Sequence, residues 1–522
     1  MVVNARMTAL RELGARRVAL ALSCGVALCC VGLAWSLASP IGASPDDDFH
    51  LATIWCLTGD RELCQRTGEA VEEGIERVIV APGLPEGMPC FAMRPVASAA
   101  CQVLPEPGSP SGPSVSRAND GLYPDGFYRL MSLFVSADVG RSVVVMRMVS
   151  WLLASALMAA AFLLAERELR RAFVLAALTT LVPLGVFLFA STNPSGVAVA
   201  GVAAYWCAAY AFLSLPRVRS RRALAVVGIL LTASVVALVS RADAGLFLAL
   251  ASIGAWISTG GHRTFLRARS SLLLGITVVG GIATVRGRQS QRWAGELGAE
   301  ESNSLAADLF EAVLEVPRRV LGALGVVELG WLDTPMPALV SILMVLAFGG
   351  VVVLGLGAPS REKWLALAAV SGAVVSIATI VLVSGQNVQP RYLLPLLPVV
   401  AGTALATQRG ADAVVIRRGQ ALVVVGAIVV AHAAALHRNI RRYVTGIDEG
   451  GPDLGEAAEW WWSFGPGPMA IWLLGALAFA VLGACAVPLI ASEPPAGSSE
   501  GEPRRRVELD ERSVDVVAPR RE

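Results

Sequence analysis

Long apolar runs separated by short polar connections cover most of the chain. A helix of about 20 apolar residues crosses the roughly 30 Å hydrocarbon layer of a membrane. The pattern therefore predicts an all-α polytopic integral membrane protein with about twelve membrane-spanning helices. Two of the runs, 244–258 and 271–285, are shorter than the roughly 17 residues that a full crossing needs. The expected spans lie near residues 18–39, 143–165, 172–190, 196–213, 223–240, 244–258, 271–285, 338–358, 364–384, 392–407, 420–436 and 469–490.

The first run, Val18 to Ala38, follows several arginines and resembles the core of a secretory signal. Such a core has only about 7–15 apolar residues, so the length of this run favours an uncleaved first span. Cleavage near Ala38-Ser39-Pro40 is the alternative.

The distribution of basic residues predicts the orientation, because short cytoplasmic loops are enriched in Lys and Arg. Arginines gather in every second connection, whereas the long segment 40–141 contains more Asp and Glu than Arg. This asymmetry predicts a bacterial inner (plasma) membrane protein with both termini in the cytoplasm. We expect a cytoplasmic N-terminus at 1–17, a multi-span membrane domain at 18–490 with outer loops 40–141, 286–337 and 437–468, and a disordered cytoplasmic tail at 491–522.

Composition agrees with this picture. The chain is 55% hydrophobic and 16% charged, its mean hydropathy is +0.61 and its formal net charge is only +2. Soluble domains carry roughly 25% charged residues. These values indicate a chain surrounded by membrane lipids and give no reason to expect a nucleic acid partner. The Arg-rich, Lys-poor usage is typical of a high-GC genome and favours an actinobacterial source.

The outer loop 40–141 contains four of the nine cysteines. An even set of cysteines in an exported segment predicts disulfides, and hence a structured first loop. Of the three ways to pair them, the pairing of neighbours is favoured: Cys56 with Cys64 and Cys90 with Cys101. The alternative is that these thiols are free or partly buried.

The other two outer loops carry membrane-surface signals. Apolar residues at spacings of three and four in 305–324 predict an amphipathic helix along the outer surface, kinked near Pro317. Trp460, Trp461 and Trp462 precede the last span and are typical of an aromatic belt at the headgroup level. Stacking against a sugar is the alternative for this triplet.

Three consecutive carboxylates, Asp46, Asp47 and Asp48, follow the first span, with His50 close behind. Neighbouring carboxylates repel one another and need a cation, an arginine or a proton. Such a block can hold a divalent cation such as Mg²⁺ or Mn²⁺ through Asp46 and Asp47, or supply a general base. The alternative is an N-terminal cap for a helix that begins at Phe49, since Asp is a good capping residue.

Three arginines are candidates for binding a phosphate. Arg147 lies inside the second span, where a charged side chain needs a partner, and we expect that partner among the three aspartates. Arg241 precedes Asp243 at an outer turn, where a local ion pair is the alternative. Arg391 lies at the outer start of a span, and its guanidinium fork suits a phosphate.

Several blocks together resemble one bacterial membrane-protein family, domain of unknown function 2142, over roughly residues 18–445. The blocks are Pro45-Asp46-Asp47-x-x-His50, Tyr123-Pro124, Asn193-Pro194, Gly330-Trp331-Leu332-Asp333-Thr334-Pro335 and Arg391-Tyr392-Leu393-Leu394-Pro395. The family more often has Pro-Asp-Glu at the first block and Gln-Gly-Arg before the last. The departure at the first block leaves open which aspartate acts.

The family is similar to the GT-C glycosyltransferases, which take a sugar from a polyprenyl phosphate. The resemblance implies a GT-C-like fold, with Asp46 or Asp47 as catalytic base or metal ligand on the first outer loop. The donor phosphate would bind Arg391, with Arg241 or Arg147, and Asp48, His50, Tyr123, Asn193, Trp331, Asp333 and Tyr392 would support the site. The expected partners are a polyprenyl-phosphate-linked sugar and an envelope polysaccharide or glycolipid acceptor. The alternatives are a transporter or flippase of lipid-linked glycans, and a noncatalytic scaffold for envelope assembly.

Overall fold

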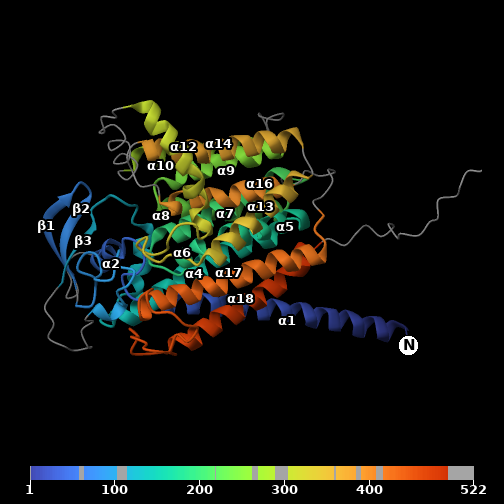
Figure 1. Ribbon diagram of the computed structural model, residues 1–522. Helices are drawn as coiled ribbons and strands as arrows, with labels where there is room; N and C mark the ends of the chain where they lie inside the picture. Colours follow the sequence, from blue (N-terminus) through green and yellow to red (C-terminus); the bar gives the residue numbers. More distant parts are fainter. Residues whose placement is uncertain are drawn as a thin grey trace, which may run out of the picture.

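The computed structural model is a bundle of long helices with a small β-sheet at one end (Figure 1). It describes residues 2–57, 64–80, 82–102, 114–217, 219–260, 268–287, 304–357, 360–383, 389–406 and 415–491. The first helix, α1 (Val2–Leu37), begins at the end of the bundle opposite the sheet and runs toward it. We call the two ends the sheet end and the N-terminal end. All but the first residue of the predicted tail at 491–522 lies outside the described residues.

Fourteen further helices build the bundle and its edges, and nine helices in the described parts of the chain are long and apolar enough to cross a membrane. These nine are Ala19–Leu37 of α1, Arg269–Arg286 of α10, and the whole of α4, α7, α8, α13, α14, α17 and α18. The helices after α1 are α4 (Val139–Leu164), α5 (Arg167–Thr180), α6 (Leu184–Phe189), α7 (Pro194–Ser214), α8 (Arg221–Ser240), α9 (Ala244–Ser258), α10 (Ala268–Arg286), α12 (Leu305–Leu321), α13 (Ala338–Leu356), α14 (Arg361–Val383), α15 (Pro390–Leu393), α16 (Leu397–Leu405), α17 (Arg418–Val444) and α18 (Pro468–Ile490).

Three of the twelve predicted spans differ from long single helices. The run 172–190 is divided between α5 and α6, with Pro183 between them. The runs 244–258 and 392–407 form helices that are apolar but shorter than the nine candidate spans. The run 244–258 is already short in the sequence. The other two runs contain prolines, at Pro183 and at Pro395 and Pro398, which divide the helices, and a count from hydropathy does not register such breaks.

Helix α7 is the centre of the bundle. Its side chains are buried over nearly its whole length, and it packs against α4, α8 and α9. Its sequence is rich in Ala, Val and aromatic residues on all sides, as expected of a helix without a lipid-facing stripe. Asn193 caps its start and accepts from the N–H of Ser195, and Pro194 follows at the first helical position. The cap fixes where α7 begins, at the sheet end.

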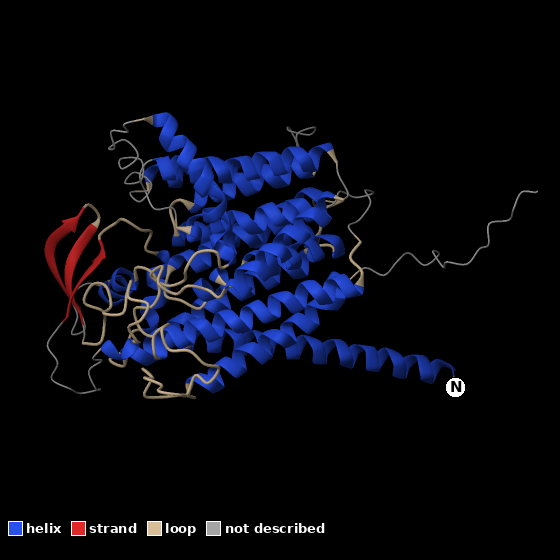
Figure 2. Cartoon of the chain, in the orientation of Figure 1, coloured by secondary structure: helices blue, strands red, loops and turns tan. Residues whose placement is uncertain are grey.

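The first outer loop folds into a small α/β unit, which the all-α prediction missed. Strands β1 (Cys64–Glu72), β2 (Ile75–Val80) and β3 (Ser114–Asn119) form an antiparallel sheet in the order β1-β2-β3 (Figure 2). Helix α2 (Asp47–Cys56) packs on β3, and α3 (Gly126–Met131) follows the sheet. The strands are short and highly charged, so their alternating pattern is weak in the sequence.

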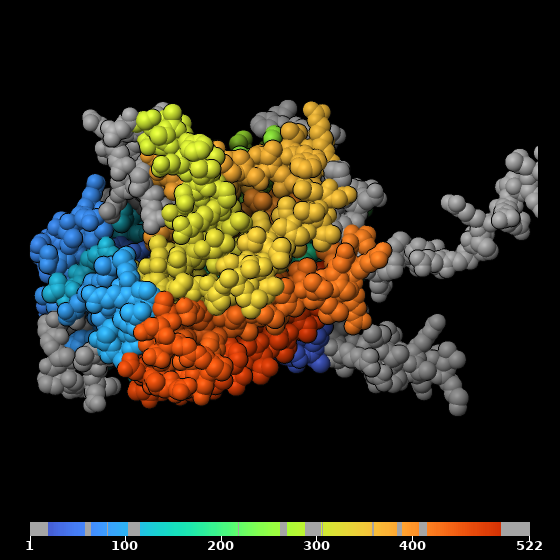
Figure 3. All heavy atoms as spheres, viewed as in Figure 1, coloured from blue at the N-terminus to red at the C-terminus, as the bar shows by residue number. Residues whose placement is uncertain are grey.

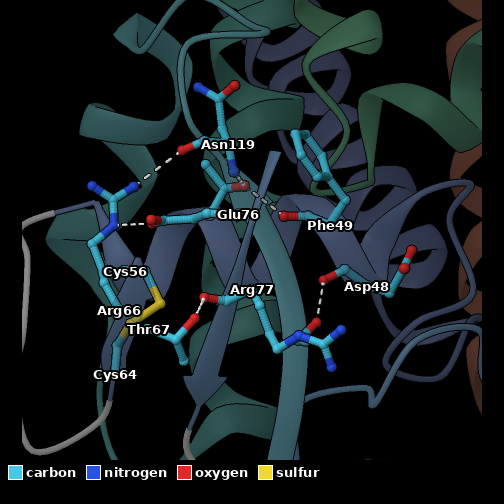
Figure 4. The surroundings of a disulfide bond; sticks show 11 residues. Asp48, Phe49, Cys56, Cys64, Arg66, Thr67, Glu76, Arg77 and Asn119 are labelled. Carbon is cyan, nitrogen blue, oxygen red and sulfur yellow. Dashed lines mark hydrogen bonds and ion pairs between the residues drawn. A yellow bond between two sulfur atoms is a disulfide. The ribbon is translucent and has the colours of Figure 1, made fainter. Parts of the chain in front are cut away.

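Both disulfides join the neighbouring cysteines, Cys56 to Cys64 and Cys90 to Cys101. The first ties the end of α2 to the start of β1, beside the Arg66–Glu76 ion pair (Figure 4). The structure therefore has the favoured one of the three pairings.

Two segments that are far apart in sequence lie side by side at the sheet end. The space-filling view shows residues near 90–100 in light blue against residues near 440–465 in orange (Figure 3). Pro95 accepts from the N–H of Ile447 at 3.0 Å, and Ser98 donates to Glu459. The predicted amphipathic helix is α12, which contains Pro317 and packs against α14 and α15. Residues 288–303 before it lie outside the described residues.

Candidate functional site

The three consecutive aspartates point to three different partners. Asp46 occupies the N-cap position of α2, and Asp47 and Asp48 form its first turn. In order, their carboxylates contact Arg391, Thr192 and Arg117. The separate partners remove the repulsion expected between adjacent carboxylates. The capping alternative is right that a helix begins at this block, but α2 begins at Asp47 and not at Phe49, and the Asp46 side chain makes no capping hydrogen bond to it.

Asp46 and Arg391 form an ion pair at the sheet end, although 345 residues separate them. Asp46 Oδ2 accepts from Arg391 Nη2 at 2.8 Å. The Asp46 side chain is 34% exposed, whereas that of Arg391 is 7% exposed. Burial alone would raise the pKa of Asp46, but the guanidinium of Arg391 outweighs it and holds that pKa below its usual value. Nε and Nη1 of Arg391 are buried and make no hydrogen bond to any described residue.

Asp46 also has an unusual backbone, with φ of 61°. A non-glycine residue in the left-handed region costs roughly 1–3 kcal/mol and persists only where the surrounding structure imposes it. The segment that leads to Asp46 is held by several buried side chains, as described below. The carboxylate is therefore aimed by its neighbours and not by the local preference of the chain.

Arg241 lies next to this pair but is already satisfied. Its Nε and Nη2 donate to the two oxygens of Asp243 at 2.8 and 2.5 Å, and its Nη1 donates to Ser195 at 2.8 Å. The Tyr392 ring lies near both arginines, with its centre 5.7 Å from Cζ of Arg241 and 5.3 Å from Cζ of Arg391. Arg241 thus has the local ion pair that was the alternative, and it also adds positive charge beside Arg391.

Aromatic side chains lie beside the Asp46–Arg391 pair. His50 Nδ1 and the Tyr128 hydroxyl are hydrogen bonded at 2.9 Å, and the ring of Tyr123 meets the His50 ring edge-on at 5.6 Å. Burial lowers the pKa of His50 to about 3, and burial raises the pKa of Tyr123 to about 12. Both groups are therefore neutral at pH 7. Among Asp46, His50 and Tyr123, only Asp46 is a charged base.

Asp47 is buried and structural. Thr192 donates to its Oδ1 at 2.5 Å, the N–H of Ser44 donates to its Oδ2 at 3.2 Å, and Arg147 Nη2 lies 3.8 Å from Oδ2. Burial raises the pKa of Asp47 to about 6, against the opposing effects of Arg147 and Thr192. With no exposed surface, this carboxylate cannot meet a substrate hydroxyl.

Arg147, predicted to bind the donor phosphate, has a different role in the structure. Its Nη1 donates to the carbonyls of Ser36 and Ser39 at 3.0 and 2.6 Å, and its Nη2 donates to that of Pro40 at 2.7 Å. The residue is 1% exposed. It lies against the carbonyl end of α1, where a cation is favourable, and the surrounding protein encloses it.

We call residues 36–45 the clamped segment, because side chains from across the chain bind its carbonyls. This segment joins α1 to Asp46. A buried carbonyl without a partner costs roughly 1–3 kcal/mol, so these donors fix the path of the backbone. Besides the Arg147 contacts, the donors and their carbonyls are Trp462 to Leu37, Asn439 to Ala38, Trp331 to Gly42, Tyr443 to Ala43 and Asn193 to Pro45.

The Trp331 block positions the segment that leads to Asp46. Trp331 donates to Gly42 at 2.8 Å, and Asp333 accepts from Arg442 at 2.8 Å with both side chains buried. Arg442 also donates to the carbonyls of Phe91 and Ala97. Gly330 has φ of 63°, and a side chain there would meet the Tyr443 hydroxyl. The block therefore joins the first outer loop to α17 and positions the clamped segment.

The carboxylates do not fit the predicted metal site. A divalent cation such as Mg²⁺ or Mn²⁺ needs several oxygen ligands around one point. Asp46 and Asp47 turn to Arg391 and to Thr192, and in the described ranges no three His, Cys, Asp or Glu side chains gather around a point. We therefore derive no step through a metal.

The structure brings together Asp46, His50, Tyr123, Arg241, Arg391 and Tyr392, all of them named from the sequence. It places Asp47, Asp48, Arg147, Asn193, Trp331 and Asp333 in supporting contacts. The sequence reading missed Arg117, Ser195, Asn439 and Arg442 as contributors. A buried basic residue at the outer end of a span was the available signal for Arg442, as it was for Arg391.

A comparison with protein families gives one finding. The model of a family described as "Predicted membrane protein (DUF2142)" matches residues 29–400 of this chain. Searches of curated proteins and of solved structures give no significant match. The matched range contains Asp46, Arg391 and the whole of the clamped segment, and it ends before α17.

Proposed function

We propose, on the premise that the chain belongs to this family of predicted membrane proteins (DUF2142), that it is a GT-C-like glycosyltransferase. It moves a sugar from a polyprenyl phosphate to an envelope glycan or lipid on the outer face of the membrane. The observation that carries the proposal is the Asp46–Arg391 pair. A partly exposed carboxylate stands 2.8 Å from a buried guanidinium, two of whose nitrogens have no hydrogen-bond partner among the described residues.

Each group has one task in the reaction. Asp46 accepts the proton of the acceptor hydroxyl, and the hydroxyl oxygen attacks the anomeric carbon. The bond from that carbon to the phosphate oxygen breaks, and its electron pair leaves with the phosphate, which gives inversion at the sugar. Arg391 stabilises the charge that develops on the phosphate, with Arg241 adding to the positive field beside it.

The neutral groups around the pair orient the reactants. His50 is hydrogen bonded to Tyr128 and does not compete with Asp46 as a base. Tyr123 and Tyr392 are partly exposed aromatic rings at the same place, and they offer flat faces to a sugar ring. The charged pair at the sheet end favours the enzyme over a transporter, which binds its substrate near the middle of the membrane.

The test is transfer of a sugar from a polyprenyl-phosphate donor by the purified protein in a lipid bilayer. We expect Asp46→Asn to lower the rate by about 10²–10⁴-fold, because a general base contributes that much. Arg391→Lys keeps the charge but loses the fork, and we expect a loss of about 10²–10³-fold, as for the removal of one donor at a transition-state oxyanion. Asp125→Asn, a partly exposed carboxylate outside the pair, is the matched control. Full activity of Asp46→Asn would contradict the proposal.

A further inference from the structure

We propose that the Asp46–Arg391 ion pair is a latch that the donor phosphate opens, so that the base is released only after the donor has bound. The inference rests on the proposed function and adds to it an order of binding, donor before acceptor. It follows from which atoms of the guanidinium are occupied, from how Asp46 is held, and from the pairing of the neighbouring charges.

The occupied atom of Arg391 is the one that a phosphate needs. A guanidinium offers two edges for a two-pronged contact, Nε with Nη2 and Nη1 with Nη2, and both use an N–H of Nη2. One Nη2 contact goes to Asp46 at 2.8 Å, and the other goes to the Tyr392 hydroxyl at 3.3 Å. Nε and Nη1 have no partner among the described residues. In the resting protein, each edge therefore has one nitrogen that is open, Nε or Nη1, and one that is already occupied, Nη2.

Of the two Nη2 partners, Asp46 is the one that a phosphate displaces. A carboxylate and a phosphate on one guanidinium repel each other, whereas a neutral phenol can donate a hydrogen bond to the phosphate. Tyr392 can therefore stay in place when the donor arrives. Asp46 cannot stay beside the phosphate without a proton.

Asp46 is held weakly enough to be displaced. Its side chain makes no capping bond to α2, and its contact with Arg391 is the one hydrogen bond that its carboxylate has within the described ranges. Its backbone, by contrast, is fixed by the clamped segment, where Asn193 holds the carbonyl of Pro45 at 3.0 Å. The carboxylate can thus rotate about its own side-chain bonds toward the exposed side while the main chain stays in place.

The neighbouring acidic residues do not share this freedom. Asp48 binds Arg117 through two oxygens and is 2% exposed, and Asp243 binds Arg241 through two oxygens. Both are two-pronged pairs, and neither arginine has a buried N–H without a partner among the described residues. Asp46–Arg391 combines a one-pronged contact with spare donors. That combination suits exchange of one anion for another.

Release also changes Asp46 as a base. While the pair is closed, the guanidinium lowers the pKa of the Asp46 carboxyl, which makes it a poor proton acceptor. Once the phosphate neutralises Arg391, this effect is lost and the carboxylate becomes more basic. The donor therefore both frees the base and strengthens it, and an acceptor that arrives first meets an inactive site.

The experiment measures binding of a polyprenyl monophosphate that carries no sugar to the full-length protein in detergent. We expect Asp46→Asn to bind this lipid about tenfold more tightly than the wild type, because the variant no longer spends most of its time in a closed state. The uncharged polyprenol should bind both proteins equally. Asp125→Asn removes a neighbouring carboxylate outside the pair and should leave the affinity for the phosphate lipid unchanged.

Three results would overturn the latch, and they separate it from the proposed function. Equal or weaker binding by Asp46→Asn, with clear binding by the wild type, removes the latch and leaves the donor assignment standing. Equally tighter binding by Asp125→Asn shows a general effect of charge and no latch. Failure of the wild type to prefer the phosphate lipid over polyprenol removes the donor assignment, and the latch with it.

Discussion

At the scale of single residues, adjacent aspartates have different tasks because their surroundings differ. Asp46 is partly exposed and paired with Arg391, whereas Asp47 is fully buried against Thr192. The pKa values of the two carboxyl groups accordingly shift in opposite directions: that of Asp46 is lowered, and that of Asp47 is raised to about 6. The sequence named both as candidates for the base, and of the two only Asp46 is exposed in the structure.

The pKa of Asp47 predicts an effect on stability. A carboxyl with a folded-state pKa of about 6 and an unfolded value of about 3.9 binds more protons when folded, so it lowers the free energy of unfolding as pH rises from about 4 to about 6. His50 acts oppositely: its folded-state pKa of about 3 lies below its ordinary value of about 6.5, so stability is lost as pH falls through that window. The two contributions partly cancel in the wild type.

We therefore expect Asp47→Asn to make unfolding more sensitive to acid. The measurement is the thermal unfolding midpoint of the detergent-solubilised protein between pH 4 and pH 7, with Asp125→Asn as control. The unfolding midpoint of Asp47→Asn minus that of the wild type should be larger at pH 7 than at pH 4. The reason is that the variant loses the Asp47 contribution, which falls with rising pH, and keeps the opposite contribution of His50. A constant difference from the wild type across this range would contradict the pKa assigned to Asp47.

The sequence could name Asp46 and Arg391, and it placed the partner of Arg147 among the three aspartates, which the contact with Asp47 confirms. It could not predict that Thr192 binds Asp47 or that Arg147 also binds the end of α1. A charged residue at the outer end of a span is conspicuous against apolar neighbours, and this singled out Arg391 and Arg147. Whether such an arginine faces a ligand or a carbonyl depends on how helices pack. Arg147 turned toward the end of α1, and nothing in its own neighbourhood of sequence predicts that.

At the scale of elements, the ion pair between Asp333 and Arg442 joins three parts of the sheet end. Arg442 of α17 contacts Asp333 and the carbonyls of Phe91 and Ala97, in the loop that the Cys90–Cys101 disulfide closes. The sequence predicted the disulfide from spacing and the spans from hydropathy. It could not predict these contacts, because the donor and its acceptors lie more than 100 residues apart.

We expect Arg442→Met to destabilise the protein by about 3–5 kcal/mol, because it leaves the buried Asp333 carboxylate without its cation. Arg438→Met, on the same helix with a single carbonyl contact to Pro335, is the matched control and should cost much less. The measurement is unfolding in detergent, followed by limited proteolysis of residues 82–102. Restoration of stability by Asp333→Leu added to Arg442→Met would show that the unpaired charge causes the loss. Equal losses for Arg438→Met and Arg442→Met would contradict the role of the ion pair.

At the scale of the whole molecule, the sheet and the start of α1 lie at opposite ends of the bundle (Figure 1). Hydropathy and the positions of arginines were enough to predict a helical membrane protein and this polarity. They missed the three-stranded sheet and the breaks within the runs 172–190 and 392–407, because charged strands and broken helices leave weak signals in a single sequence.

The polarity predicts which surface is accessible from outside the cell. We expect a membrane-impermeant maleimide to label Val71→Cys, on the exposed face of β1, in intact cells. Arg219→Cys, between α7 and α8 at the N-terminal end, should be labelled only after the cells are permeabilised. The unmodified protein gives the background from its own free cysteines. Labelling in the reverse order would contradict the orientation.

The clamped segment also has a consequence for how the protein is made. Residues 36–45 leave the ribosome early, but the donors for their carbonyls include Trp331, Asn439, Tyr443 and Trp462, which are synthesised hundreds of residues later. Until α17 and the loop after it have been added, several of these carbonyls lack their partners. The loop that carries Asp46 therefore takes its final shape only when synthesis is nearly complete. A ribosome that stops early leaves a chain whose first spans are inserted but whose candidate base is not yet aimed.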